Sequence, residues 1–483
     1  MKIKLLLVIG LVGVGIYLVI PSCGNSSNEI NADSTHSKYL NHSDTAYYVG
    51  MDQCRSCHEN IYQTFIQTGM GQSFDHATES KSVAHFGPKD SFGRKESLIY
   101  DDDKDFWYES YFQDSSMYIH EFRLKGKDTT YSRTEKVEYI VGSGQHTNSH
   151  MYSVNGYFFQ MPMTYYAQDG KWDLPPGFEG GFNSRFSRKI GLECMSCHNS
   201  LPEFVLGSEN KYESVPNGIG CERCHGPGSI HLKDKLAGNK VDTSKYIDYT
   251  IVNPGKLSPE LQFDVCQRCH LQGNAVLKPG KSFFDFRPGM ELNSVMTVFM
   301  PKYEGAEDQF IMASHAERLK MSECFIQTEN NREVNSDSLR PYKNALTCVT
   351  CHDPHVSVKS TGDATFNAAC VNCHKGGKMQ LISCSDTEEH LAATENNCVS
   401  CHMPRTGAID IPHVTVHDHF IRKPSPGGIV NEADSIAKFL GLYAVNERNP
   451  APEIVAKAYL QHFEKFDHTL SHLDSAKKYL PSS

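Results

Sequence analysis

The chain has no excess of positive charge, and it has little cysteine outside one repeated pattern. Its 483 residues include 47 Lys and Arg against 57 Asp and Glu, which gives a formal net charge of −10. A chain without a broad basic surface is not expected to bind nucleic acid. Of the 17 cysteines, Cys23, Cys324 and Cys384 stand apart from the pattern, so neither a disulfide scaffold nor a single dithiol site accounts for the rest.

The first 23 residues have the features of an export signal. A short basic start is followed by an unbroken apolar run from Leu5 to Ile20 and then by Pro21-Ser22-Cys23. Residues 1–22 are therefore predicted to be a signal peptide of the lipoprotein type, with Cys23 as the lipidated first residue; an uncleaved N-terminal anchor is the alternative. Residues 23–48 are predicted to be a flexible tether. We expect an exported protein, in the periplasm or at the cell surface, anchored to a membrane.

Fourteen cysteines form seven pairs, each with two residues between the thiols and a histidine directly after the second. We number these motifs 1 to 7 in chain order: Cys54-Cys57-His58, Cys194-Cys197-His198, Cys221-Cys224-His225, Cys266-Cys269-His270, Cys348-Cys351-His352, Cys370-Cys373-His374 and Cys398-Cys401-His402. Thiols at this spacing lie one helical turn apart and can add to the two vinyl groups of one haem, whose iron the histidine then binds as proximal ligand. The pattern predicts seven covalently bound haem c groups.

Zinc sites, redox-active dithiols and disulfides are the other uses of paired cysteines. A zinc site needs four ligands and no histidine at a fixed offset of one, and a dithiol enzyme needs one pair. Haem attachment explains the pattern better. The two remaining thiols, Cys324 and Cys384, are predicted to form a disulfide that staples a region with little ordinary core. Two separate buried thiols are the alternative.

The motifs are unevenly spaced and divide the chain. Motif 1 lies in a first haem segment, residues 49–84. Residues 85–175 hold no motif, and aromatic and branched runs such as Phe106-Trp107-Tyr108 and Val137-Glu138-Tyr139-Ile140-Val141 predict an antiparallel β-rich insertion. Motifs 2 to 7 crowd into residues 176–430, a six-haem domain.

The six-haem domain and the C-terminal tail are predicted to be helical. In the domain, short helices and loops are expected to pack around the haems, which supply most of the apolar core. Residues 431–483 contain amphipathic stretches at 452–466 and 468–480, and they predict a helical hairpin of the tetratricopeptide type that must dock on another surface. The expected fold class is α+β.

A second histidine opposite the proximal one would complete each bis-histidine haem. His231 and His355 follow the motif histidine by a few residues, with Gly or Pro between. The remaining distal candidates are His150, His315, His390, His413 and His419. Six others, interpreted as ordinary surface histidines, are His36, His42, His120, His462, His468 and His472.

Met70 is a further distal candidate. It follows motif 1 and lies between Gly69 and Gly71, a setting that does not suit a core methionine. A thioether opposite histidine raises a haem's potential relative to a bis-histidine site. A loop residue beside a haem edge is the alternative.

Three segments resemble a known family: Cys221-Glu222-Arg223-Cys224-His225-Gly226-Pro227-Gly228 with His231, Cys351-His352-Asp353-Pro354-His355, and Cys401-His402-Met403-Pro404 followed by His413 and His419. They are similar to multihaem cytochromes related to the tetrahaem cytochrome that serves hydroxylamine oxidoreductase, over roughly residues 50–420. The resemblance implies bis-histidine haems stacked in close pairs for electron transfer. The chain departs from it in having seven motifs, Met70 where relatives often place histidine, and a tail of one repeat.

The leading functional hypothesis is an electron conduit between membrane or periplasmic redox partners, with no catalytic residues. Haem propionates would make the protein more acidic, so we expect its partners to present positive patches. The alternatives are an oxidoreductase with one open-site haem, acting on a small nitrogen or sulfur compound, and a structural or filament-forming cytochrome. No motif has lysine in place of its histidine, which would have marked an open site directly.

Overall fold

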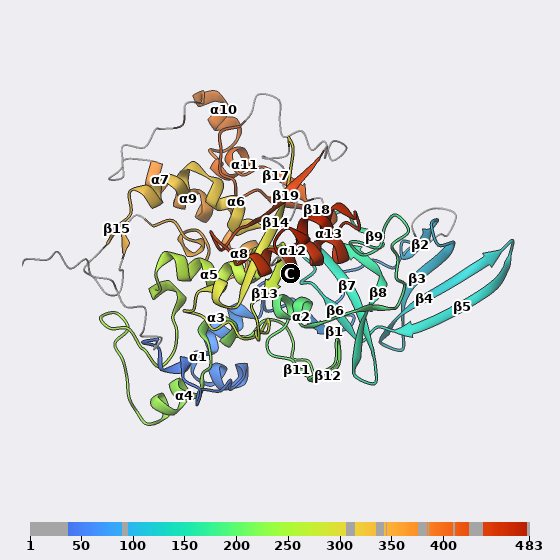
Figure 1. Ribbon diagram of the computed structural model, residues 1–483, viewed down its shortest axis with the longest axis horizontal. Helices are drawn as coiled ribbons and strands as arrows, with labels where there is room; N and C mark the ends of the chain where they lie inside the picture. Colours follow the sequence, from blue (N-terminus) through green and yellow to red (C-terminus); the bar gives the residue numbers. More distant parts are fainter. Residues whose placement is uncertain are drawn as a thin grey trace, which may run out of the picture. The chain divides into compact units, whose positions relative to one another are not determined.

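The computed structural model combines short helices with small antiparallel sheets (Figure 1). It describes residues 37–88, 95–305, 314–334, 342–343, 345–374, 384, 386–408, 411–424 and 438–480. The predicted α+β class is confirmed. The proposed signal peptide and Cys23 lie outside the described residues.

The predicted β insertion forms two sheets. The first is an antiparallel ribbon of four strands in the order β2 (Leu98–Asp101), β3 (Phe106–Gln113), β4 (Ser116–Lys125) and β5 (Asp128–Lys136), drawn in cyan and blue in Figure 1. Asp114 and Ser115 join β3 to β4 with φ of 49° and 60°, the left-handed pair that a two-residue hairpin turn requires. Alternate residues of β3 are buried, as the period of a strand with one covered face dictates.

The second sheet extends beyond the predicted limits of the insertion. Its strands are β1 (Phe74–His76), β6 (Tyr139–Val141), β7 (Thr147–Val154), β8 (Tyr157–Tyr166), β9 (Lys171–Asp173) and β10 (Arg188–Lys189). A cluster of buried side chains that includes Tyr108, Ile119, Met161 and Trp172 packs the two sheets together. The insertion therefore has an ordinary hydrophobic core that does not depend on a cofactor.

The rest of the chain is mostly short helices. They are α1 (Met51–Phe65), α2 (Leu192–His198), α3 (Glu222–His225), α4 (Ser229–Leu236), α5 (Pro259–His270), α6 (His315–Met321), α7 (Glu323–Asn330), α8 (Val358–Thr361), α9 (Asp363–His374), α10 (Glu388–Ala393), α11 (Cys398–His402), α12 (Pro452–Lys465) and α13 (Ser471–Lys477). Single 3-10 turns are η1 (Leu40–His42), η2 (Pro254–Lys256), η3 (Leu292–Ser294) and η4 (Cys348–Thr350). Among the described residues, no helix is both long and apolar enough to cross a bilayer.

The six-haem region also contains strands that the sequence analysis did not predict. Two-stranded ladders join β11 (Glu203–Phe204) to β12 (Tyr212–Ser214), β15 (Glu333–Val334) to β16 (Tyr342–Lys343) and β17 (Arg405–Ala408) to β18 (Ile411–His417). A three-stranded sheet runs in the order β13 (Asn274–Leu277), β14 (Met296–Tyr303) and β19 (Phe439–Ala444). Because β19 comes from the predicted tail, the tail is built into the haem region by strand pairing.

The predicted helical hairpin is present as α12 and α13, which pack on each other. Ile454 and Ala458 of α12 pack against Val276 and Phe299 of the three-stranded sheet, and the Asn274 side-chain amide donates to the Ala458 carbonyl at 2.7 Å. A single hairpin cannot bury its own apolar face. The sheet supplies the surface on which it docks.

Candidate haem sites

Each Cys-x-x-Cys-His motif lies on or at the end of a short helix. Five helices, α2, α3, α5, α9 and α11, end at the motif histidine itself, and α1 has a kink at His58 with φ of −114° and ψ of 38°. After α3, Gly226 adopts φ of 76°, the left-handed conformation that commonly ends a helix. The helix sets the two thiols one turn apart, and the break after it releases the imidazole from the helical register. This is the local geometry that haem attachment requires.

Thiols of different motifs lie next to one another. Hydrogen bonding couples Cys54 with Cys221, Cys197 with Cys269, and Cys266 with Cys348. In each pair the shared hydrogen bond raises the pKa of the first thiol and lowers that of the second. Motif 1 is therefore adjacent to motif 3, motif 2 to motif 4, and motif 4 to motif 5.

Weaker electrostatic coupling links the remaining motifs. Burial is the main cause of a raised pKa at Cys224, Cys351 and Cys370. The charge of Cys269 raises the pKa of Cys224 further, that of Cys373 the pKa of Cys351, and that of Cys398 the pKa of Cys370. Motif 3 thus neighbours motif 4, motif 5 neighbours motif 6, and motif 6 neighbours motif 7. All seven motifs form one connected series.

Three motif histidines face a predicted distal histidine. The ring centres are 6.0 Å apart for His225 and His355, 5.9 Å for His270 and His315, and 6.2 Å for His352 and His419. Imidazole nitrogens bind first-row metal ions at about 2.0–2.1 Å, and a ring centre lies about 1.1 Å behind its nitrogen. Two imidazoles that share one metal ion therefore have ring centres about 6.2 Å apart. The three observed spacings match this value.

Hydrogen bonds at Nδ1 orient several of these rings. The Nδ1 atoms lie 2.8 Å from the Val252 carbonyl oxygen for His225, 2.8 Å from that of Arg422 for His402 and 2.9 Å from that of His417 for His419. A carbonyl oxygen can only accept a hydrogen bond, so Nδ1 carries the hydrogen and Nε2 keeps its lone pair for a metal. Burial lowers the pKa of His419 to about 4, which keeps it neutral and competent as a ligand.

A buried carboxylate ties motif 1 to motif 3. Glu222, inside motif 3, accepts hydrogen bonds from the backbone amides of Val49 and Gly50, just before α1, and from that of Gly228. The three distances are 2.8, 2.8 and 2.7 Å. Hydrogen bonds to an ionised acceptor are stronger than neutral ones. Glu222 therefore fixes where the first haem helix begins relative to the third motif.

Two buried arginines join motifs 2, 3 and 4. Arg223 and Arg268 occupy the position before the second cysteine of motifs 3 and 4, and both donate to the Ser196 carbonyl of motif 2, at 2.9 and 3.3 Å. The Nε atoms of both are buried without a hydrogen-bond partner. A buried cation with an unused donor needs an anion. Haem propionates have that charge, so these residues fit the cofactor that the motifs predict.

A buried ion pair connects two of the distal candidates. Arg318 of α6, three residues after His315, donates to both carboxylate oxygens of Asp418 at 2.9 and 2.6 Å. Asp418 directly precedes His419, and the two charged side chains are 3% and 1% exposed. A bidentate pair holds its partners in a defined geometry. It fixes the approach of His315 and His419, whose ring centres are 4.7 Å apart.

The other predicted ligands have different surroundings. Burial lowers the pKa of His231, and the charges of Lys235 and His58 lower it further. The Nδ1 atom of His231 lies 2.9 Å from the Thr250 hydroxyl oxygen. His413 places Nδ1 3.2 Å from a carboxylate oxygen of Asp169 and Nε2 3.1 Å from one of Asp173. His150 is fully buried in the β insertion, where it stacks on Trp172. His390 lies in α10, and its side chain is outside the described part.

Met70 lies half-buried in a hydrogen-bonded turn after α1. Its carbonyl accepts from the Ile219 amide at 3.1 Å, and the Ser73 hydroxyl donates to the His198 carbonyl at 2.8 Å. The turn therefore lies between motifs 2 and 3. Gly218, with φ of 50°, has no room for a Cβ atom, which would meet the Gly71 carbonyl oxygen.

The predicted disulfide is not formed in the structure. Cys324 and Cys384 are both free thiols. Burial raises the pKa of Cys324, and the charge of Cys373 in motif 6 raises it further. Cys324 therefore lies near the haem-attachment thiols. The two thiols are separate, but Cys324 is only partly buried and Cys384 is exposed, whereas the alternative expected both to be buried.

Sequence analysis missed several residues of these sites. His417 places Nδ1 2.8 Å from the Met403 carbonyl oxygen, the same orientation as His419. Glu222, Arg223 and Arg268 were not singled out either. The recurrence of arginine before the second cysteine of motifs 3 and 4 was the available signal, but only the folded chain shows that both arginines reach Ser196.

Comparisons with known proteins agree with the motif geometry. The family described as "Cytochrome c554 and c-prime" matches residues 182–226, which contain motifs 2 and 3, and the "Doubled CXXCH motif" family matches residues 340–379, which contain motifs 5 and 6. The multiheme cytochrome MtrA of Shewanella baltica is 27% identical over 250 residues, which are 48% of this chain and 67% of that protein. The chain is a multihaem c-type cytochrome.

Two further proteins are similar to this cytochrome. The dissimilatory sulfite reductase MccA of Wolinella succinogenes is 23% identical over 245 residues, or 44% of the cytochrome and 27% of the reductase. The crystal structure of the outer cell wall cytochrome OcwA aligns with a TM-score of 0.48 and 15% identity, over 78% of this cytochrome and 79% of that chain. The match to the reductase covers about a quarter of its length.

Proposed function

We propose that this cytochrome conducts electrons along seven covalently bound haems between redox partners outside the cytoplasm. The observation that carries the proposal is the proximity of the motifs: hydrogen bonds join thiols of motifs 1 and 3, 2 and 4, and 4 and 5, and the thiols of motifs 3 and 4, 5 and 6, and 6 and 7 are close enough for their charges to interact. Haems attached to adjacent thiols are held side by side, as transfer between them requires. In this order, motifs 1, 3, 4, 5, 6 and 7 form a line, and motif 2 lies beside motif 4.

Haem supplies a one-electron iron couple when bound. The chain's own residues hold the ligands and tune the surroundings. We assign His355, His315 and His419 as the distal ligands of motifs 3, 4 and 5, on the basis of the ring spacings. His231, whose pKa the charge of His58 lowers, is the candidate for motif 1. Met70, His390 and His413 remain candidates for the other motifs. His150 is enclosed by protein, and we leave it out of the ligand set.

The N-terminal segment fits the same role. A lipidated Cys23 followed by the polar tether would hold the haem region near a membrane while leaving it free to meet donor and acceptor proteins. The net charge of −10, made more negative by haem propionates, favours partners with basic docking patches.

A carbon monoxide difference spectrum of the fully reduced holoprotein tests the proposal. Carbon monoxide binds ferrous haem with an open or easily vacated sixth position. A conduit with six-coordinate irons gives no shift. A shift that corresponds to one haem would contradict it and would favour an oxidoreductase with one open site.

The oxidoreductase alternative has one support: the cytochrome is similar over part of its length to a dissimilatory sulfite reductase. Turnover of sulfite, nitrite or hydroxylamine by the holoprotein, together with carbon monoxide binding to one haem, would establish this second function.

A further inference from the structure

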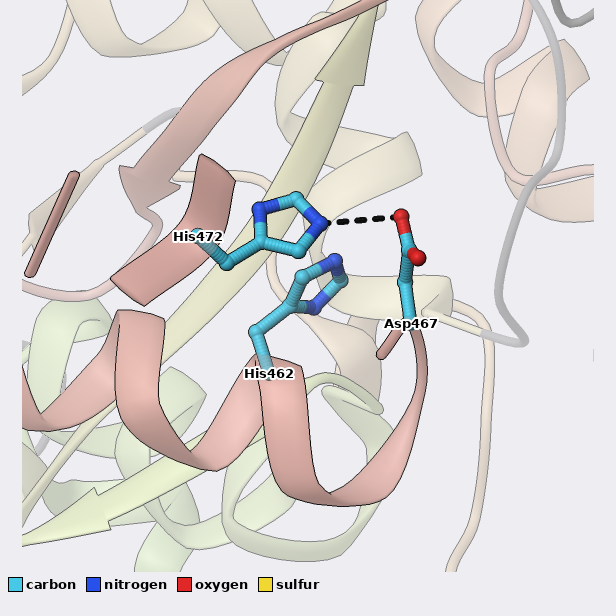
Figure 2. Close-up of side chains that lie close together, drawn as sticks. All are labelled: His462, Asp467 and His472. Atoms are coloured by element: carbon cyan, nitrogen blue, oxygen red, sulfur yellow. Dashed lines mark hydrogen bonds and ion pairs between the residues drawn. The ribbon is translucent and has the colours of Figure 1, made fainter. Parts of the chain in front are cut away.

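The C-terminal hairpin brings together two histidines and an aspartate that the haem sites do not use. His462 lies near the end of α12, Asp467 lies in the connection, and His472 lies in α13, so the three are spaced five residues apart along the chain. One ligand atom of each lies within 4.8 Å of the other two. Figure 2 shows the two imidazoles and the carboxylate converging on one point.

The two histidines are buried, not exposed as the sequence analysis predicted. His462 is 3% exposed and His472 is 2% exposed. Their ring centres are 4.9 Å apart, and His462 Nε2 and His472 Nδ1 are buried without a hydrogen-bond partner. Each buried nitrogen without a partner costs free energy. His472 turns its other nitrogen, Nε2, toward Asp467, so the unpartnered Nε2 of His462 is the buried nitrogen for which a metal ion would provide a partner.

The surrounding side chains enclose and position the cluster. Phe439 of β19 stacks on His462 at 5.3 Å and meets His472 edge-on at 4.6 Å. The carboxylate of Asp467 lies 2.8 Å from His472 Nε2, and its other oxygen accepts from the backbone amide and hydroxyl of Thr469 at 3.1 and 2.6 Å. The carboxylate is therefore held in place toward the imidazoles. From β14, the half-buried Tyr303 has its phenol pKa raised by burial and by the nearby charge of Asp467.

We propose that His462, Asp467 and His472 bind one zinc ion, with water as the fourth ligand. Zinc takes imidazole nitrogen at about 2.0–2.1 Å and carboxylate oxygen at about 2.0–2.2 Å in a tetrahedral arrangement, so its ligand atoms stand about 3.3 to 3.5 Å apart. In the structure the three ligand atoms lie within 4.8 Å of one another, so zinc binding requires the side chains to shift from their present positions. The metal is not a haem iron, because both imidazoles are buried and leave no open face for a porphyrin.

The site has a structural role in this proposal and is independent of electron transfer. The three ligands come from α12, α13 and the turn between them, and Phe439 comes from the strand that pairs with β14. A zinc ion would close the hairpin and hold it against the three-stranded sheet. One hairpin has little area of its own to bury, so a metal is an effective way to fix it.

Zinc binding is tested on the haem-loaded protein. The protein is stripped with EDTA, incubated with zinc chloride and desalted, and zinc per chain is measured by inductively coupled plasma mass spectrometry. Wild type is expected to retain one zinc ion. H462Q and H472Q are expected to bind at least about 100-fold more weakly, since each removes a direct ligand, and D467N to be weakened as well. H468Q is the matched control because His468 is exposed in the same hairpin.

X-ray absorption at the zinc edge of the wild-type protein provides a readout that does not depend on the variants folding. The expected first shell contains nitrogen and oxygen with imidazole scattering and no sulfur. Sulfur in the shell would mean that zinc occupies unfilled haem motifs, and it would overturn the proposal. No zinc retained, or equal retention by H462Q, H472Q and H468Q, would overturn it as well and leave the cluster a hydrogen-bonded polar network.

Discussion

At the scale of single residues, the attachment residues were predictable and the distal ligands only partly so. A Cys-x-x-Cys-His motif is a local pattern, so every attachment residue is visible in the sequence. A distal histidine is brought to its iron by the fold: His225 and His355 are far apart in sequence but have ring centres 6.0 Å apart. The sequence analysis named His315, His355 and His419, which face motif histidines, and it named His150, which the structure buries in a β-sheet core.

The first residue-scale prediction concerns Met70. If its thioether is an axial ligand, M70H replaces it with imidazole and lowers one haem midpoint potential, because histidine stabilises the ferric state relative to methionine. Spectroelectrochemical titration measures this. M70L keeps the size, removes the ligand, and is expected to yield one haem that binds carbon monoxide. A titration of M70H that is identical to wild type would refute the assignment.

The second residue-scale prediction concerns His150. Burial lowers its pKa from 6.5 to about 4, and its hydrogen bond with the Met163 carbonyl offsets this only in part. The unfolded chain therefore binds this proton more readily than the folded one, and stability falls as pH drops from about 6.5 towards about 4. At pH 4.5 we expect a loss of roughly 2 to 3 kcal/mol.

Urea unfolding at pH 7 and pH 4.5 measures this loss. H150F has no imidazole to protonate at this position, so its loss of unfolding free energy between pH 7 and pH 4.5 is expected to be smaller than that of wild type by roughly 2 to 3 kcal/mol. Its haem spectrum is expected to be unchanged. An equal loss in the two proteins would refute the prediction. A changed haem spectrum in H150F would instead return His150 to the ligand set.

At the scale of elements, the sequence analysis predicted the strands and helices whose apolar side chains repeat with a regular local period. Alternating aromatic and branched residues predicted the β insertion, and amphipathic stretches predicted α12 and α13. It did not find β13, β14 and β19, because β19 pairs with a strand more than a hundred residues earlier. It also interpreted His462 and His472 as exposed, because it did not predict β19, whose Phe439 packs on both imidazoles.

The element-scale prediction concerns the ion pair that joins α6 to the segment after β18. D418N leaves the buried Arg318 guanidinium without its carboxylate, and removing one partner of a buried pair costs roughly 3–5 kcal/mol. We expect a lower thermal unfolding midpoint and a changed spectrum of one haem, because His419 adjoins Asp418. The control is D242N, whose pair with Lys245 has side chains that are 49% and 71% exposed; it is expected to change stability by less than about 1 kcal/mol. Equal midpoints for D418N and D242N would contradict this account.

At the scale of the whole molecule, the sequence predicts how many motifs there are but not how they are arranged. Motif 1 precedes motif 2 along the chain, yet its thiol Cys54 adjoins Cys221 of motif 3. The frame that sets this order is made of long-range polar contacts, such as Glu222 with the amides before α1 and Arg223 and Arg268 with Ser196. The repeated arginine of motifs 3 and 4 is visible in the sequence, but which groups these side chains contact is set only by the fold.

The central claim is that haems held by adjacent motifs form a continuous series with paired histidine ligands. Anomalous diffraction at the iron edge from crystals of the exported holoprotein tests it most directly, because it locates each iron independently of any model. The account predicts seven iron peaks, three of them midway between His225 and His355, His270 and His315, and His352 and His419, with neighbours in the order 1, 3, 4, 5, 6, 7 and motif 2 beside motif 4. Fewer peaks, or irons displaced from these imidazole pairs, would contradict it.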